Sequence, residues 1–195
     1  MQFYDVCSSR SREGNRSWRT LQPDAGFEEE VAMTMQDPIV ITGAARTPIG
    51  GFQGAFASLA APQLGGSAIA AAFSQNQVPA ECVDEIIVGC VLAAGQGQAP
   101  ARQAAIGAGL PFSTAASTVN KMCGSGMKAV MIGHDLLAAG SASVVIAGGM
   151  ESMTNAPYLL DRARGGYRLG HGRVVDHMFL DGLEDAYEKG RLMGT

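Results

Sequence analysis

Short apolar runs rich in β-branched residues alternate along this chain with longer segments of helical periodicity. Residues 62–77, for example, place their apolar side chains on one face of a helix. Strands that alternate with helices indicate an α/β fold, in which a mostly parallel sheet is covered by helices. The predicted strands are 38–44, 83–92, 114–119 and 143–147, and the predicted helices are 62–77, 99–109 and 124–140.

The composition predicts a chain with a substantial core and no polyanionic partner. Hydrophobic residues make up 47% of the 195 residues and charged residues only 16%. The net charge of -4 gives no electrostatic footprint for nucleic acid or an anionic membrane. Gly, Ser, Lys or His interrupts every long apolar stretch, so none reaches the ~18 residues needed to cross a bilayer. We therefore expect neither a nucleic-acid partner nor a membrane partner.

The four cysteines, Cys7, Cys82, Cys90 and Cys123, lie far apart and lack the spacing of a metal site. The chain also shows no secretory signal. We therefore expect reduced thiols, no bound metal and a cytoplasmic location.

Residues 1–36 differ in composition from the rest of the chain. Arginines and serines come first, and an acidic run follows. This pattern predicts a disordered leader. Met33 and Met35 stand just before the first predicted strand, so we expect the native start at one of them.

Cys123 lies between a predicted strand and a predicted helix, with Gly124 and Gly126 close behind it. The positive end of a helix dipole favours a thiolate there, and the glycines would let a substrate approach the backbone. The Cys123 backbone amide could also face an oxyanion. One interpretation is a nucleophile that forms an acyl-thioester. The other is a small buried cysteine on a tightly packed helix.

Four ordered segments decide between these interpretations. Together they resemble the thiolase family, of the acetoacetyl-CoA type, in its N-terminal half. The resemblance implies a layered fold in which the helix after the nucleophilic cysteine is central and buried. The segments are ITGAARTPIG (41–50), GQGQAPARQAA (95–105), VNKMCGSGMKA (119–129) and AGGMESMTNAP (147–157).

The resemblance also implies an activity. Acetyl or acyl groups would move between coenzyme A thioesters through an acyl group on Cys123, with no cofactor beyond these substrates. It implies a family core over 37–156 and a truncated tetramerisation and CoA-binding loop domain over 157–195, in a dimer or tetramer. Leu183 would line the pantetheine arm, and Met193 and Met153 the acyl pocket.

Three motifs that the resemblance implies are absent from these 195 residues. They are the Gly-His-Pro histidine, the Cys-x-Gly cysteine and the Asn-Glu-Ala-Phe segment. His134, His171 and His177 all stand in other settings, and His134 would lie about three helical turns from Cys123. We therefore expect the chain alone to be a very poor catalyst.

Three alternatives remain open. The chain could be a half-thiolase subunit that acts only with a second chain. It could be a non-catalytic protein that binds acyl-CoA, although retention of Cys123 argues against this. It could also be a condensing enzyme related to ketoacyl synthases, although the segments at 95–105 and 147–157 favour a thiolase.

Overall fold

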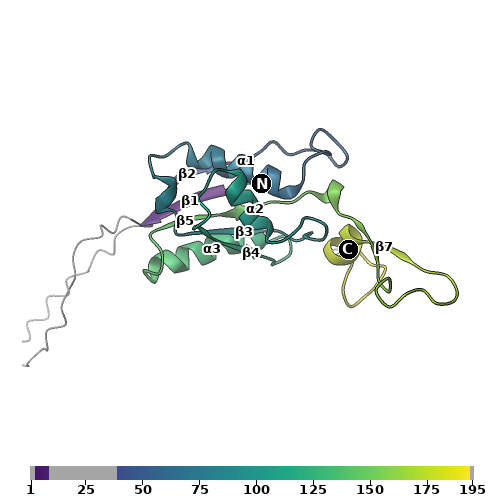
Figure 1. Ribbon diagram of the computed structural model, residues 1–195. Coiled ribbons are helices and arrows are strands. Elements are labelled where there is room, and N and C mark those ends of the chain that lie inside the picture. Colours follow the sequence, from purple (N-terminus) through teal and green to yellow (C-terminus); the bar gives the residue numbers. More distant parts are fainter. Residues whose placement is uncertain (1–2, 9–38, 194–195) are drawn as a thin grey trace, which may run out of the picture.

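The computed structural model describes residues 3–8 and 39–193. Most of this part is a five-stranded sheet with helices on both faces, and a small hairpin projects from it (Figure 1). The strands are β1 (Phe3–Ser8), β2 (Ile39–Ala45), β3 (Glu85–Gly89), β4 (Ala115–Val119), β5 (Val144–Gly149), β6 (Tyr158–Leu160) and β7 (Val174–Asp176). The helices are α1 (Ala61–Phe73), α2 (Pro100–Gly107) and α3 (Ser125–Ala138), with short 3-10 turns at Ala80–Cys82 and Met153–Asn155 and a π-helical turn at Phe179–Leu183.

The main sheet has the strand order β2-β1-β5-β3-β4. Strands β3, β4 and β5 are parallel, and β1 is antiparallel to both β2 and β5. Strand β2 therefore runs in the same direction as β5. The predicted α/β fold with a mostly parallel sheet is confirmed. Each predicted strand of the main sheet, and each predicted helix that packs on it, is present within a few residues of its expected bounds.

The prediction of a disordered leader is wrong for Phe3–Ser8, which forms β1 in the sheet. Strands β2 and β5 would each present an unpaired backbone edge toward the other without it. An extended segment between them satisfies both sets of N–H and C=O groups. Residues 9–36, including the predicted start at Met33 or Met35, lie outside the described residues.

The helices cover the two faces of the sheet separately. Helices α1 and α2 pack on one face, and α3 packs on the other (Figure 1). Because successive strand residues point to opposite faces, Ile86 and Val88 of β3 pack with α1 and α2, whereas Ile87 packs with α3. This two-sided burial explains why β3 is apolar throughout and shows no alternation.

Helix α3 packs on the sheet with one face, and its other face is open within the described residues. It contacts the sheet through Ser125, Ala129, Gly133 and Leu137, one residue from each turn. These residues are mostly small, so the helix comes close to the sheet. Met127 and Met131, which we expected to face inward with Val130 and Leu137, are 73% and 51% exposed because they project from the other side.

The N-terminus of α3 presses against the ends of two strands. A Cβ atom on Gly89 of β3 would lie 2.4 Å from the Ser125 carbonyl carbon, and one on Gly149 of β5 would lie 3.1 Å from Gly126 Cα. Gly126 therefore serves the contact between helix and sheet. Only glycine fits where two backbones come this close.

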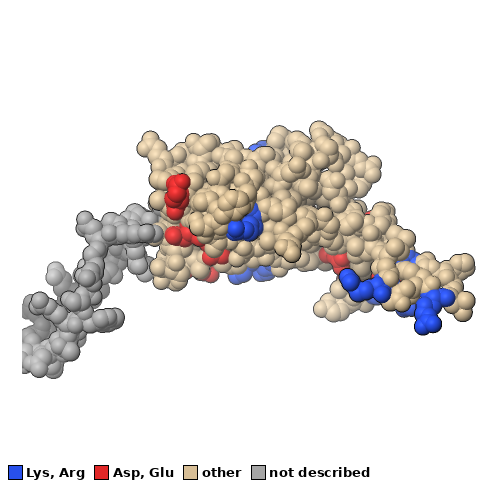
Figure 2. Space-filling view, in the orientation of Figure 1, with Lys and Arg blue, Asp and Glu red and all other residues tan. Residues whose placement is uncertain are grey.

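Residues 158–176 form the β6–β7 hairpin, which projects away from the main sheet (Figure 1). Its exposed loop carries Arg162, Arg164, Arg168 and Arg173, and Figure 2 shows Lys and Arg side chains on this projecting part. The hairpin and the following π-helical turn occupy the region that we expected to be a loop domain. Within the described residues, every helix is too short or too polar to cross a membrane.

The glycine contact generates a stability prediction. Gly89→Ala should lower the free energy of unfolding by about 2–3 kcal/mol, because the new methyl group meets backbone atoms that cannot rotate away. Gly107→Ala is the matched control, since a Cβ at Gly107 meets no atom within 4 Å. Urea unfolding of both variants measures the difference. Equal stabilities would contradict the close contact.

Candidate active site

Strands β3, β4 and β5 are parallel, so their carboxyl ends meet at one edge of the sheet, where open α/β folds bind ligands. Cys90 follows β3, the segment 120–123 follows β4, and Glu151 lies two residues after β5. Cys123 is exposed and stands one residue before Gly124, the N-cap of α3. The predicted position of Cys123 at a helix N-terminus is confirmed.

The turn that presents Cys123 is held in an unusual backbone conformation. Met122 has φ 48°, in the left-handed region that non-glycine residues seldom adopt. Asn120 Oδ1 accepts the Met122 N–H at 2.9 Å. The buried Ser125 hydroxyl donates to the Met122 carbonyl at 2.6 Å and accepts the Lys121 N–H at 2.8 Å. These bonds fix the chain on both sides of Met122, directly before the candidate nucleophile.

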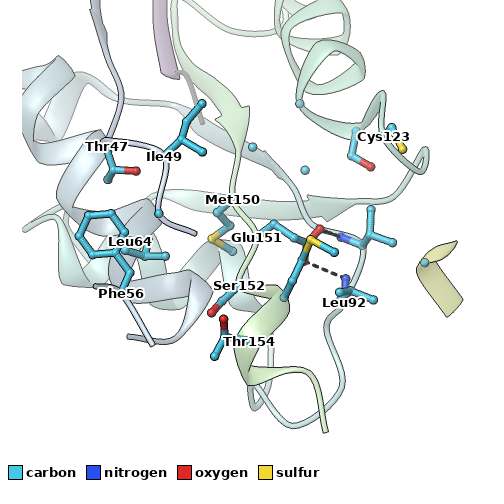
Figure 3. Close-up of a pocket in the computed structure, with 18 of the residues that line it drawn as sticks. Thr47, Ile49, Phe56, Leu64, Leu92, Cys123, Met150, Glu151, Ser152 and Thr154 are labelled. Carbon is cyan, nitrogen blue, oxygen red and sulfur yellow. Dashed lines mark hydrogen bonds between the residues drawn. The ribbon is translucent and has the colours of Figure 1, made fainter. Parts of the chain in front are cut away.

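Cys123 opens into a cavity of about 1050 Å³ (Figure 3). The volume is at the upper end of the range for small-molecule sites, and the lining is mostly apolar, as in such sites. The lining includes Met153 and Leu183, so the structure brings these two predicted residues together with Cys123. Met193 is outside the lining, although its N–H donates to the Leu183 carbonyl at 2.9 Å.

The histidines lie away from this cavity, as their sequence settings suggested. None of the three lines the cavity within the described residues. His134 is exposed on α3, and His171 is exposed in the hairpin loop. His177 is buried, and both of its ring nitrogens are engaged, by Asp181 and by the Ala94 N–H. The described residues thus supply no histidine base beside Cys123.

Cys90 and Glu151 are two residues for which the sequence suggested no role. Burial raises the pKa of Cys90 to about 12, and the nearby carboxylate of Glu151 adds to the rise. The Cys90 thiol lies 3.6 Å from Glu151 Oε1. It therefore stays protonated at neutral pH and is not a second nucleophile. A charged residue just after a buried strand was the signal that could have identified Glu151.

The raised pKa of Cys90 predicts a pH dependence of stability. An unfolded Cys90 loses its proton near pH 9, whereas the folded thiol keeps it up to about pH 12. The free energy of unfolding should therefore fall between pH 9 and pH 12, because the unfolded state releases its proton first. Cys90→Ser, whose hydroxyl does not ionise, should show a shallower fall in urea titrations. Parallel curves for both proteins would refute the assignment.

Comparison with known proteins identifies the family to which the sequence is similar. Residues 39–195 match the profile of the thiolase N-terminal domain. An acetyl-CoA acetyltransferase of Pseudomonas aeruginosa is 51% identical over 153 residues, which cover 78% of this chain and 39% of that relative. Acetyl-CoA acetyltransferase 2 of Arabidopsis thaliana is 54% identical over 149 residues, 76% of this chain and 37% of the relative.

An acetyl-CoA acetyltransferase of Candida albicans is 50% identical over 162 residues, which cover 83% of this chain. The match spans 40% of that relative, so the chain corresponds to about two fifths of the length of these curated relatives. The profile match covers more than half of the chain and includes every element from β2 to the π-helical turn. By this match, and by the predicted fold that the structure confirms, the chain belongs to the thiolase family through its N-terminal domain.

Proposed function

We propose that this chain carries the acyl-accepting half of a thiolase reaction. The Cys123 sulfur attacks the carbonyl carbon of an acyl-CoA thioester, the carbon–sulfur bond to CoA breaks, and CoA leaves as its thiol. The products are an acyl-thioester on Cys123 and free CoA, and the proton lost by Cys123 balances the one gained by CoA. In the full reaction the acyl group passes to acetyl-CoA and gives 3-ketoacyl-CoA. The relatives' printed name, acetyl-CoA acetyltransferase, supports this choice.

One observation carries the proposal. Cys123 is exposed at the mouth of a large apolar cavity, at the carboxyl edge of parallel strands and directly before a helix N-terminus. The peptide dipoles of α3 sum to a partial positive charge at this end, which favours the negative charge that develops on an attacked carbonyl oxygen. In this proposal the Cys123 backbone N–H contributes to that stabilisation. N–H groups at the start of a helix have no hydrogen-bond partner within the helix, and Cys123 lies before that start.

The substrate contacts are assigned as follows. Leu183 and Met153 line the same cavity as Cys123, so in this proposal they would contact the pantetheine arm and the acyl group. Met193 would act through its backbone bond to Leu183, or would reach substrate only after movement of its segment. The chemistry uses CoA thioesters as substrates and needs no resident cofactor. Free thiols at Cys82, Cys90 and Cys123 suit a reducing, cytoplasmic setting.

A second candidate is a half-thiolase that acts only with a complementary polypeptide, within a larger oligomer. The exposed methionines favour it. Met127 lines the cavity and is 73% exposed, and Met131 continues the same apolar side of α3. An apolar surface continuous with a reactive cysteine is typical of an interface. The two candidates share acylation of Cys123 and differ in whether this chain turns over without a partner.

Acylation of Cys123 is tested by intact-protein mass after incubation with acetyl-CoA. We expect one added acetyl group, because the thiol and the cavity are both accessible. Cys123→Ser should remove it. Cys82→Ser is the matched control, since Cys82 is also exposed but lies at the opposite end of β3.

Two outcomes would count against the proposal. Label that persists in Cys123→Ser would place the reactive group elsewhere. Absence of label in a folded chain whose Cys123 still reacts with iodoacetamide would show an accessible thiol without acyl-transfer chemistry. Slow turnover that rises only when a C-terminal thiolase fragment is added would favour the partner-dependent candidate.

A further inference from the structure

Glu151 is the only charged residue in the lining of the Cys123 cavity within the described part of the chain. It lies two residues after β5 and is half-buried among apolar neighbours. A carboxylate in such surroundings is costly unless hydrogen bonds compensate its charge. Its partners therefore indicate what it does in the site.

Both carboxylate oxygens of Glu151 are engaged by the loop that follows β3. Oε2 accepts the Val91 N–H at 2.9 Å, and Oε1 accepts the Leu92 N–H at 3.0 Å. The protonated Cys90 thiol lies 3.6 Å from Oε1. Figure 3 shows the side chain directed at the backbone of this loop. Charge-assisted bonds of this kind are about twice as strong as neutral ones, so Glu151 clamps two successive peptide units.

The loop held by Glu151 packs against the part of the cavity wall that the π-helical turn forms. A Cβ atom on Gly182 would lie 3.2 Å from Leu92 Cδ2, so the Leu92 side chain packs directly against the π-helical turn. Two residues further on, the Ala94 N–H donates to His177 Nε2 at 3.4 Å. His177 Nδ1 in turn contacts Asp181 Oδ2 at 2.6 Å, inside the same turn. The position of Leu183 in the wall thus depends on the loop, and the loop depends on Glu151.

We infer that Glu151 is a positioning residue for the Cys123 site: by holding Val91 and Leu92, it sets the separation between Cys123 and the wall that contains Leu183. This inference rests on the proposed function, in which that wall contacts the acyl-CoA. Glu151 acts through the loop and does not touch the reacting atoms. Its loss should weaken the seating of acyl-CoA and leave the intrinsic reactivity of the thiol unchanged.

The competing interpretation makes Glu151 a general base that removes the Cys123 proton. The geometry argues against it, because both carboxylate oxygens already accept backbone N–H groups. The two interpretations differ in a measurable way. Loss of a base slows the reaction of Cys123 with every electrophile, whereas loss of a positioning residue slows only the reaction that needs the wall.

The test compares Glu151→Gln with the matched control Glu85→Gln. Both changes remove one negative charge, but Glu85 lies at the start of β3, at the far edge of the sheet, where Oε1 accepts the Ser117 hydroxyl. In Glu151→Gln one backbone N–H faces an amide NH₂ and loses its acceptor. Glu151→Asp keeps the charge and shortens the reach by one methylene, and it serves as the second variant if the glutamine variant does not fold.

Three readouts decide the inference on the full chain. Amide hydrogen exchange at Val91, Leu92 and 179–183 should rise about tenfold or more in Glu151→Gln relative to the control, because a charge-assisted bond is lost. The acetyl-CoA concentration that half-saturates acetylation of Cys123 should rise about as much. The rate of Cys123 alkylation by iodoacetamide should stay within about twofold of the wild-type rate.

Unchanged amide exchange would overturn the inference. So would a parallel fall in alkylation and acetylation, which would instead identify a base. If wild-type Cys123 reacts with iodoacetamide but is never acetylated, the proposed function fails in this chain. Amide exchange then decides on its own whether Glu151 fixes the loop and the wall.

Discussion

The contact between the N-terminus of α3 and the ends of β3 and β5 is the constraint on which the rest of the structure depends. Gly89, Gly126 and Gly149 let the helix backbone meet the strand backbones without intervening side chains. This contact fixes where α3 begins, and therefore where the preceding turn must place Cys123. Larger residues would lift the helix from the sheet and move the cysteine away from the cavity. Close packing at Gly89 and Gly149 thus helps to fix the position of the turn that carries Cys123.

Two cysteines at this edge of the sheet, Cys123 and Cys90, lie in different environments. Cys123 is exposed before the N-terminus of α3, whereas Cys90, after the neighbouring strand, is buried. Burial, together with the nearby Glu151 carboxylate, raises the pKa of Cys90 to about 12. Burial and charge thus suppress one cysteine while the other stays accessible. Glu151 suppresses ionisation of Cys90 and also holds the loop that faces Cys123. A single carboxylate therefore contributes both to selectivity between thiols and to the shape of the cavity.

Much of this could be predicted from the sequence, because strand and helix periods are local properties. Strands β2 to β5, helices α1 to α3 and the place of Cys123 before a helix follow from such patterns. The pairing of Phe3–Ser8 with β2 and β5 could not be predicted, because it depends on edges created by distant strands. The inward face of α3 was also assigned wrongly at Met127 and Met131. Apolar periodicity favoured the large residues, whereas close packing selected the small ones, Ala129 and Gly133.

The exposed side of α3 bears on how the site excludes water. Acyl transfer benefits when the reacting atoms leave bulk solvent, because electrostatic stabilisation is stronger where the dielectric constant is low. The described residues enclose the cavity with the loop after β3 and the π-helical turn, but Met127 remains 73% exposed at its margin. A partner surface on this side would bury Met127 and Met131 and would also exclude water from the cavity. Under the proposed function, burial of apolar area would then stabilise an assembly that also shields Cys123 from water.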